Sequence, residues 1–259
     1  MSSDDILKTM GHHAAKHTEA EKSAVARLAE AFETSSVPLP QRLQNFPRHV
    51  RRQDIARFLA RLELFQLGLS VNGNIVECGV FAGGGLMSWL HFSSIYEPYN
   101  HTRRIVAFDT FDGFPSLDAK DTQQGTSDHL HQQAFRISAT MQDEIAALAT
   151  LHDENRPLGH IPKIELVSGD ACETIPRYVQ EHPSLLISLI YLDFDIYAPT
   201  KAALEHLYPR IVKGGIVAFD ELNCPDFPGE TTALLERFDL REVQLRRTAT
   251  DPYISYFIK

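Results

Sequence analysis

Five short apolar runs, each ending in a glycine or an acid, constrain the fold of this chain more than any other feature. Near-continuous apolar runs of this length are typical of parallel strands that are covered on both faces. Helical patterns such as GGGLMSWLHFSSIYE and PTKAALEHLYPRI lie between several of them, which favours alternating strands and helices. The runs are NIVECG (74–79), RRIVAFD (103–109), KIELVSG (163–169), LLISLIYLD (185–193) and GGIVAFD (214–220).

The chain closes with two segments of alternating polarity, LREVQLRRT and PYISYFIK, joined by a short turn. Such a pair predicts antiparallel strands. We therefore expect an α/β fold with a Rossmann-like, doubly wound, seven-stranded sheet, in which five parallel strands are followed by a C-terminal antiparallel pair. Residues 1–72 read as an N-terminal helical extension and residues 73–259 as the main domain. Residues 110–162 interrupt the alternation, and a polar connection of this length predicts a lid-like insertion.

Charge and cysteine content indicate which macromolecular partners the protein is not expected to bind and in which compartment it is expected to lie. The formal net charge of -9 and the pI near 5.7 argue against a broad basic surface for nucleic acid or an anionic membrane. The three cysteines (Cys78, Cys172 and Cys224) form no CxxC pair, so we expect a reducing, cytoplasmic location. No apolar stretch reaches the roughly 18 residues of a membrane span. His13 and His17 have a zinc-compatible spacing, but no third ligand accompanies them.

A glycine-rich turn follows the first predicted strand and opens a helix. The segment VECGVFAGGGLMSWL contains Glu77, Gly79, Gly83, Gly84 and Gly85. Glycines at such a turn let the backbone approach a ligand closely, and the helix N-terminus presents N–H groups to it. The spacing E-x-G-x-x-x-G-G is neither the dinucleotide fingerprint nor the P-loop. It resembles motif I of class I S-adenosylmethionine-dependent methyltransferases; tight packing of the turn is the alternative reading.

The next two predicted strands also end in groups that suit a nucleoside. Asp109 ends the second run, where open α/β folds place an acid for ribose hydroxyls. Gly169 ends the third run and Asp170 follows it, at the same edge of the sheet, where an adenine would lie. A turn or helix-capping role is the simpler alternative for Asp109.

Two acidic pairs follow the last two predicted parallel strands. Asp193 and Asp195 come after LLISLIYL, and Asp220 and Glu221 come after KGGIVAF. If the strands are neighbours, about 4.8 Å apart, these acids converge at one edge of the sheet. An all-oxygen set suits a hard cation, Mg²⁺ first, with Mn²⁺ or Ca²⁺ as alternatives. The competing interpretation is that the acids cap the helices that follow, with Asp195 the favoured cap.

The longest motif makes the resemblance specific. YLDFDIYAPTKAALEHLYPRIVKGGIVAFDE resembles the signature of the macrocin O-methyltransferase (TylF/MycF) family, which methylates sugar hydroxyls of natural products. IVECGVFAGGG and AFDTFDGFP resemble its cofactor segments, and PRHVRRQDIARFLARLELFQ resembles its first helix. The similarity runs from about residue 46 to 238. The family is similar in plan to catechol O-methyltransferase, in which acids at two adjacent strand ends hold a magnesium ion.

The resemblance implies a role for each residue that matches a motif. It implies that Asp193, Asp220 and Glu221 are metal ligands and that Asp195 is the general base. The family commonly has two aspartates where this chain has Asp220 and Glu221, and residues 116–160 match it poorly. The implied cofactor-binding residues are Glu77, Gly79, Val80, Phe81, Gly83, Gly84, Asp109, Thr110, Gly169, Asp170 and Asp193.

The function implied is a Mg²⁺-dependent, S-adenosylmethionine-dependent O-methyltransferase. Its expected acceptor is a hydroxyl on the sugar of a natural product or glycoconjugate, and its N-terminal helices are expected to mediate a homo-oligomer. A metal-independent class I methyltransferase acting on another small molecule is the nearest alternative. A nicotinamide-dependent Rossmann oxidoreductase is a more distant one, because the glycine spacing counts against it.

Overall fold

The computed structural model describes residues 18–123 and 125–259, so His13 and His17 lie outside the described residues. The chain divides into two compact units, 1–59 and 60–259. The division falls inside helix α4 (Arg52–Gly68), earlier than the boundary at residue 72 expected from the sequence. The C-terminal part of α4 therefore belongs to the larger unit.

The smaller unit is helical in its described part. Helix α2 (Glu19–Glu33) begins with a capping box, in which the Thr18 hydroxyl accepts from the Glu21 N–H and the Glu21 carboxylate accepts from the Thr18 N–H. Helix α3 (Leu39–Gln44) and the short 3₁₀ helix η2 (Phe46–Arg48) follow it. None of these elements has a buried residue. An oligomer formed through this unit stays a prediction.

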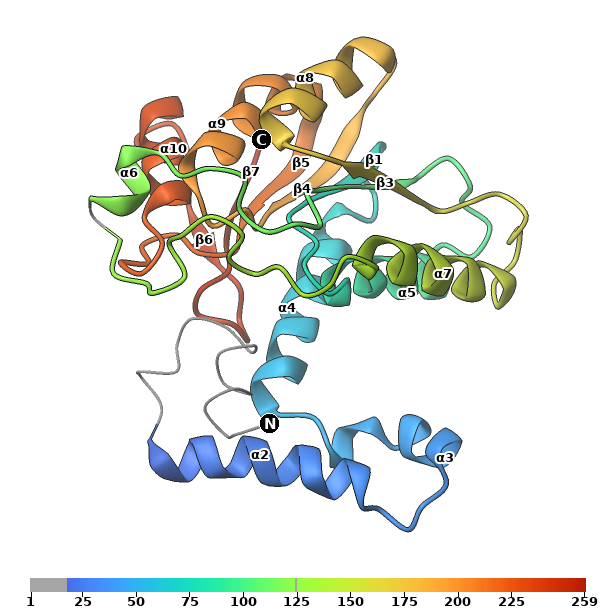
Figure 1. The fold of residues 1–259 in the computed structure, drawn as a ribbon. Helices are drawn as coiled ribbons and strands as arrows, with labels where there is room; N and C mark the ends of the chain where they lie inside the picture. Colours follow the sequence, from blue (N-terminus) through green and yellow to red (C-terminus); the bar gives the residue numbers. More distant parts are fainter. Residues whose placement is uncertain (1–17, 124) are drawn as a thin grey trace. The chain divides into compact units, whose positions relative to one another are not determined.

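The larger unit is built on a single sheet, as the sequence predicted. In the part of the chain that the structure describes, seven strands lie in the order β3-β2-β1-β4-β5-β7-β6 (Figure 1). The first five strands pair in parallel, and β7 pairs antiparallel with both β5 and β6. The strands are β1 (Asn74–Cys78), β2 (Ile105–Asp109), β3 (Ile164–Ser168), β4 (Ile187–Leu192), β5 (Ile211–Phe219), β6 (Arg246–Arg247) and β7 (Ser255–Ile258).

Helices cover both faces of the sheet (Figure 1). One apolar core lies between the sheet and the helices α8, α9 and α10, and a second lies between the sheet and the helices α4, α5 and α7. Among the described residues, no helix is both long and apolar enough to cross a membrane. The helices of this unit are α5 (Gly84–Tyr96), α6 (Ala119–Thr122), α7 (Met141–Glu154), α8 (Ala171–Glu181), α9 (Tyr197–His206), the 3₁₀ helix η3 (Tyr208–Arg210) and α10 (Gly229–Arg237).

The C-terminal antiparallel pair is shorter than the sequence pattern predicted. Strand β6 contains only two residues of the nine in LREVQLRRT, and both are exposed. Leu240 and Leu245 of this segment are 51% and 39% exposed, whereas Val243 is partly buried against the core. Most of the segment therefore lies at the surface, with little burial to hold it as a strand, and the edge of the sheet ends early.

The insertion between β2 and β3 is anchored to the rest of the unit. Within it, the Phe114 N–H donates to the Ala134 carbonyl (3.2 Å), and the Gln133 N–H donates to the Phe114 carbonyl (2.9 Å). Phe114 and Ala134 form a small apolar cluster with Ile196 and Phe227, which follow β4 and β5. Part of the insertion thus packs near the carboxyl ends of those strands, and its role as a lid stays a prediction.

Candidate functional site

The glycine turn and the predicted metal ligands meet at the ends of three adjacent strands. Cys78, Leu192 and Phe219 are in register across β1, β4 and β5. One residue further on, the Asp193 N–H donates to the Cys78 carbonyl (2.7 Å), and the Asp220 N–H donates to the Leu192 carbonyl (2.8 Å). The strand ends therefore bring Asp193 and Asp220 to one level, as the sequence predicted for neighbouring strands.

Gly79 has to be a glycine because it lies directly against Asp193. Its φ of +95° is in the left-handed range, and a Cβ there would lie 1.9 Å from the Asp193 carbonyl oxygen. A side chain at this position would push the end of β1 away from the end of β4. The glycine turn, which is expected to bind the cofactor, and the segment that carries Asp193 are thus in direct backbone contact.

Asp109 organises the glycine turn. Its Oδ2 accepts hydrogen bonds from the N–H groups of Val80 (2.6 Å) and Phe81 (3.1 Å), and its Oδ1 accepts one from the Phe111 N–H (2.7 Å). Phe81 has a φ of +51° and is 43% exposed. A carboxylate has about four acceptor positions, so the expected contact with a ribose hydroxyl is compatible with these three bonds and stays a prediction.

The remaining predicted cofactor residues at β2 and β3 also make local hydrogen bonds. The Thr110 hydroxyl donates to the Gly113 carbonyl (2.6 Å). The Gly169 N–H donates to the Asp109 carbonyl (3.0 Å). Asp170 is the N-cap of α8, and its side chain accepts from the Cys172 N–H (2.9 Å). The Gly169–Asp109 bond ties the ends of β2 and β3 together, and the other two bonds shape the loop after β2 and the start of α8.

Glu77 lies beneath the turn. Its side chain points to the α4 and α5 side of the sheet and is only 1% exposed, and a Cβ on Gly85 would meet its Oε1 at 2.0 Å. Burial raises the pKa of Glu77 to about 8, while the positive charge of Arg61 opposes the shift. This acid therefore supports the first turn of α5 from within the core, and its predicted cofactor role stays a prediction.

Arg61 is a site residue that the sequence reasoning missed. It lies on the larger unit's part of α4 and is 9% exposed. Its Nη2 is 3.7 Å from Oδ2 of Asp193, and its guanidinium carbon is 5.1 Å from the centre of the Tyr191 ring. The signal was present, because Arg61 shares the buried face of α4 with Ala60, Leu64 and Phe65. A charged residue within a helix's apolar stripe needs a partner inside the protein.

The second acid pair is more deeply buried than the first. Asp220 is 1% exposed and accepts a hydrogen bond from the Tyr191 hydroxyl. Glu221 is 0% exposed, whereas Asp193 and Asp195 are half-buried. The two half-buried acids are therefore the ones that an acceptor could reach.

Glu230, in the first turn of α10, is a second residue of the site that the sequence pattern did not reveal. It is 0% exposed; its Oε1 accepts from the Asp195 N–H (3.4 Å), and its Oε2 accepts from the Glu221 N–H (3.2 Å). Burial raises its pKa well above the usual value, and the nearby acids, Glu221 first, raise it further. Glu230 thus links the loops after β4 and β5. No local pattern in FPGETTALLE distinguishes it from an ordinary acid at a helix start.

Asp195 does not lie on a strand. Strand β4 ends at Leu192, and Asp195 has a left-handed φ of +62°. The alternation of side chains along a strand, by which residues two apart face the same way, therefore does not apply to Asp193 and Asp195. The N-cap position of α9 belongs to Ile196. A left-handed φ is uncommon for a residue other than glycine and is often found at functional sites. The role of Asp195 as a general base stays a prediction.

The donor chemistry of the acids fits a hard divalent cation. Asp193, Asp220 and Glu221 offer carboxylate oxygens, which Mg²⁺ and Ca²⁺ prefer. Over residues 18–123 and 125–259, no three His, Cys, Asp or Glu side chains are arranged as a ligand set. The residue types fit a metal, and the metal itself stays a prediction.

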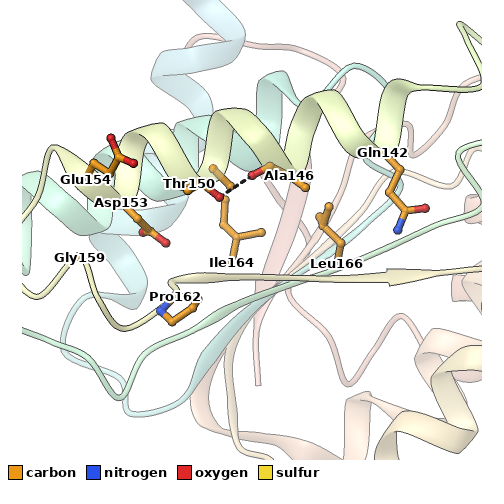
Figure 2. A pocket seen from close by; sticks show the side chains of 10 residues that line it. Gln142, Ala146, Thr150, Asp153, Glu154, Gly159, Pro162, Ile164 and Leu166 are labelled. Atoms are coloured by element: carbon orange, nitrogen blue, oxygen red, sulfur yellow. Dashed lines mark hydrogen bonds between the residues drawn. The ribbon is translucent and has the colours of Figure 1, made fainter.

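A separate cavity lies between α7 and the edge strand β3, as Figure 2 shows. Its volume is about 390 Å³, and none of the residues that line it is a predicted site residue. Its most buried acid, Asp153, accepts hydrogen bonds from Arg156 (2.7 Å) and from the Lys163 N–H (3.3 Å). This carboxylate holds the loop before β3 in place through these hydrogen bonds. We therefore place the functional site at the strand ends and not in this cavity.

Comparison with known proteins decides the family. Residues 51–238 match the family model of the macrocin-O-methyltransferases (TylF). The chain belongs to this family. The residues that match the TylF model include the glycine turn, both acid pairs and the LDFDIYAPTKAALEHLYPR motif.

Solved structures agree with the TylF assignment. The chain is similar to a crystal structure of CalS11, a calicheamicin methyltransferase, with a TM-score of 0.89, 35% identity and 93% of each chain covered. An apo structure of CalS11, described as a TDP-rhamnose 3'-O-methyltransferase, matches with a TM-score of 0.81 and 32% identity, over 93% of this chain and 95% of that one.

Curated relatives match over a shorter span. A mycinamicin III 3''-O-methyltransferase from Micromonospora griseorubida is 25% identical, over 60% of this chain and 57% of its own length. A 4'-O-methyltransferase of a rhamnosyl-tetracenomycin from Streptomyces olivaceus is 27% identical, over 58% of this chain and 53% of its own length. The chain thus matches little more than half of the length of these relatives.

Proposed function

We propose that this TylF-family chain is an S-adenosylmethionine-dependent O-methyltransferase that methylates a sugar hydroxyl with the help of a divalent cation, Mg²⁺ first. The observation that carries the proposal is the backbone contact between Gly79 and Asp193. Methyl transfer needs the donor and the acceptor oxygen to be held next to each other. The turn expected to hold the donor and the acids expected to activate the acceptor adjoin at this contact.

The acceptor we propose is a deoxysugar, attached either to a nucleoside diphosphate or to a natural product. The support comes from the relatives, since CalS11 is described as acting on TDP-rhamnose and the tetracenomycin enzyme on a rhamnosyl derivative. The 110–162 insertion is where the choice between the two would be made, because part of it packs beside Ile196 and Phe227 after β4 and β5. We propose that it covers the bound acceptor.

The chain's own residues would perform three tasks. Asp109 holds the glycine turn in shape through the N–H groups of Val80 and Phe81. Asp195, half-buried at the open side of the acids, would take the proton of the acceptor hydroxyl. Closure of the insertion would exclude water. S-adenosylmethionine supplies the electrophilic methyl group, and a cation held by Asp193, Asp220 and Glu221 would lower the pKa of the hydroxyl.

The test is a methylation assay with TDP-rhamnose and a rhamnosylated aglycone as acceptors, read by the mass gain of one methylene. We expect turnover with S-adenosylmethionine that is lost after exhaustive chelation and restored by Mg²⁺. Asp193→Ala, Asp220→Asn and Asp195→Asn should each lower kcat by at least about 100-fold while the protein stays folded. Glu181→Gln, a change at the exposed last residue of α8, is the control.

Three outcomes would reject parts of the proposal. Full activity after chelation would reject the cation and favour a metal-independent methyltransferase. Full activity of Asp195→Asn would reject this residue as the base. Calorimetric binding of a nicotinamide dinucleotide, with no binding of S-adenosylhomocysteine, would reject methyl transfer altogether.

A further inference from the structure

An acid inside the insertion, Asp121, is buried where the insertion meets the segments that follow β4 and β5. Asp121 lies on the short helix α6 and is only 1% exposed, although it belongs to a polar segment. A buried carboxylate is costly unless hydrogen bonds compensate for the lost water. The hydrogen-bond partners of Asp121 therefore show which elements its buried carboxylate holds in position.

Asp121 caps a helix that lies far away in the sequence. Its Oδ1 accepts a hydrogen bond from the N–H of Tyr197 (2.8 Å), which is the first residue of α9 and lies 76 positions later. The N-cap residue of α9 is Ile196, whose side chain has no acceptor. The cap that a Ser, Thr, Asp or Asn normally supplies locally thus comes from the insertion. The other oxygen, Oδ2, accepts from the Asp118 N–H (2.9 Å) and closes α6 itself.

The same carboxylate also lies against the start of α10. A Cβ on Gly229 would lie 2.5 Å from Oδ1 of Asp121 and 2.4 Å from the Tyr197 nitrogen. The next residue, Glu230, binds the Asp195 and Glu221 backbones. Asp121 therefore lies against the start of α9 and the start of α10, the segments that follow the two acid pairs. Its contact in α9, Tyr197, is two residues after Asp195 in the sequence.

We propose that Asp121 is a positioning residue for the proton acceptor Asp195, and this rests on the proposed function. The left-handed φ of Asp195 needs surrounding contacts to hold it. Its backbone is restrained on one side by Glu230 and on the other by the capped start of α9. Loss of the cap releases the α9 side and lets the carboxylate of Asp195 leave its productive position.

The test uses Asp121→Ala, Asp121→Asn and, as a matched control on the same helix, Lys120→Ala. Lys120 contacts the Tyr197 ring and Glu236 through a side chain that is 39% exposed, so its loss should change kcat by less than about twofold. Asp121→Ala should lower kcat by about 30-fold, because small misplacements of a reacting group have effects of this size. The dissociation constant of S-adenosylhomocysteine should change by less than about threefold, since the glycine turn is untouched. Asp121→Asn retains one acceptor oxygen and should recover most of the rate.

The deciding measurement is a double-mutant cycle with Asp195→Asn, made well below the unfolding temperature of every variant. If Asp121 acts through Asp195, adding Asp121→Ala to Asp195→Asn lowers kcat by less than about threefold further. A further loss near 30-fold would overturn the inference, as would full kcat in Asp121→Ala alone. Failure of the proposed function has a different signature: either the wild-type protein does not methylate, or Asp195→Asn remains fully active.

Discussion

Glu77 makes the stability of this protein depend on pH in a direction that can be measured. The residue is buried beneath α5, and its pKa rises from 4.5 to about 8 because burial penalises the charged form more than Arg61 stabilises it. Between these two values the unfolded chain releases a proton that the folded chain retains. Stability is therefore lost as the pH rises through this window.

The magnitude follows from the size of the shift. One pKa unit corresponds to about 1.4 kcal/mol, so Glu77 should cost the folded state roughly 2 to 3 kcal/mol of stability between pH 5 and pH 7. Glu77→Gln keeps the shape of the side chain and removes the proton. The stability of the variant relative to the wild type should therefore increase by that amount over this range and level off above pH 8.

The assay is chemical unfolding followed by circular dichroism at pH 5, 6, 7, 8 and 9, without cofactor. Glu173→Gln, a change at an exposed position in the first turn of α8, is the control, and its difference from the wild type should stay flat. The reasoning is refuted if the Glu77→Gln difference does not change between pH 5 and pH 8. A difference that falls as the pH rises would show instead that Glu77 is ionised and paired with Arg61.

Two further predictions test the site through pairs of variants. Gly79→Ala should destabilise the protein by about 3 kcal/mol, because the new Cβ meets the Asp193 backbone and φ is left-handed. A Cβ added at Gly84 would have nothing within 4 Å, so Gly84→Ala should leave the unfolding midpoint unchanged. Because the cofactor is expected to approach this glycine, the change should weaken S-adenosylhomocysteine binding about 10-fold. Unchanged affinity in calorimetry would remove Gly84 from the cofactor site. Tyr191→Phe should cost about 1–3 kcal/mol because it takes a hydrogen-bond donor from the buried Asp220. Tyr178→Phe removes a hydrogen-bond donor from Glu165, whose side chain is 25% exposed. In urea unfolding, this change should therefore lower the free energy of unfolding less than Tyr191→Phe does. Equal losses from the two changes would contradict the reasoning.

Much of the larger unit could be predicted from the sequence. Apolar runs that end in glycine or an acid identified each parallel strand to within a few residues, because a strand covered on both faces needs apolar residues along its whole length. The same runs identified Gly79, Asp193 and Asp220 as residues at strand ends. Parallel strands bring such ends to one edge of a sheet, so the location of the site followed from local patterns.

The contacts around the acids could not be predicted in this way. Arg61, Glu230 and Asp121 act on the site from α4, α10 and the insertion, and each depends on segments far apart in the chain packing together. The backbone of Asp195 is a second example. Its sequence pattern continues the strand, but the chain turns to a left-handed φ after Leu192 because Glu230 and the capped α9 hold it there.

The sequence by itself determined the α/β fold and the edge of the sheet where the candidate site lies, because these depend on periodicity and turn residues within short windows. The TylF family was indicated separately, by the resemblance of the longer motifs. Only the tertiary structure decided which charges are buried and what they hold: Glu77 beneath the glycine turn, Glu230 between two loops, and Asp121 at the start of α9. The physical reason is that burial and hydrogen bonding of a charge depend on partners from other elements. Such partners are separated in sequence and meet only when the chain has folded.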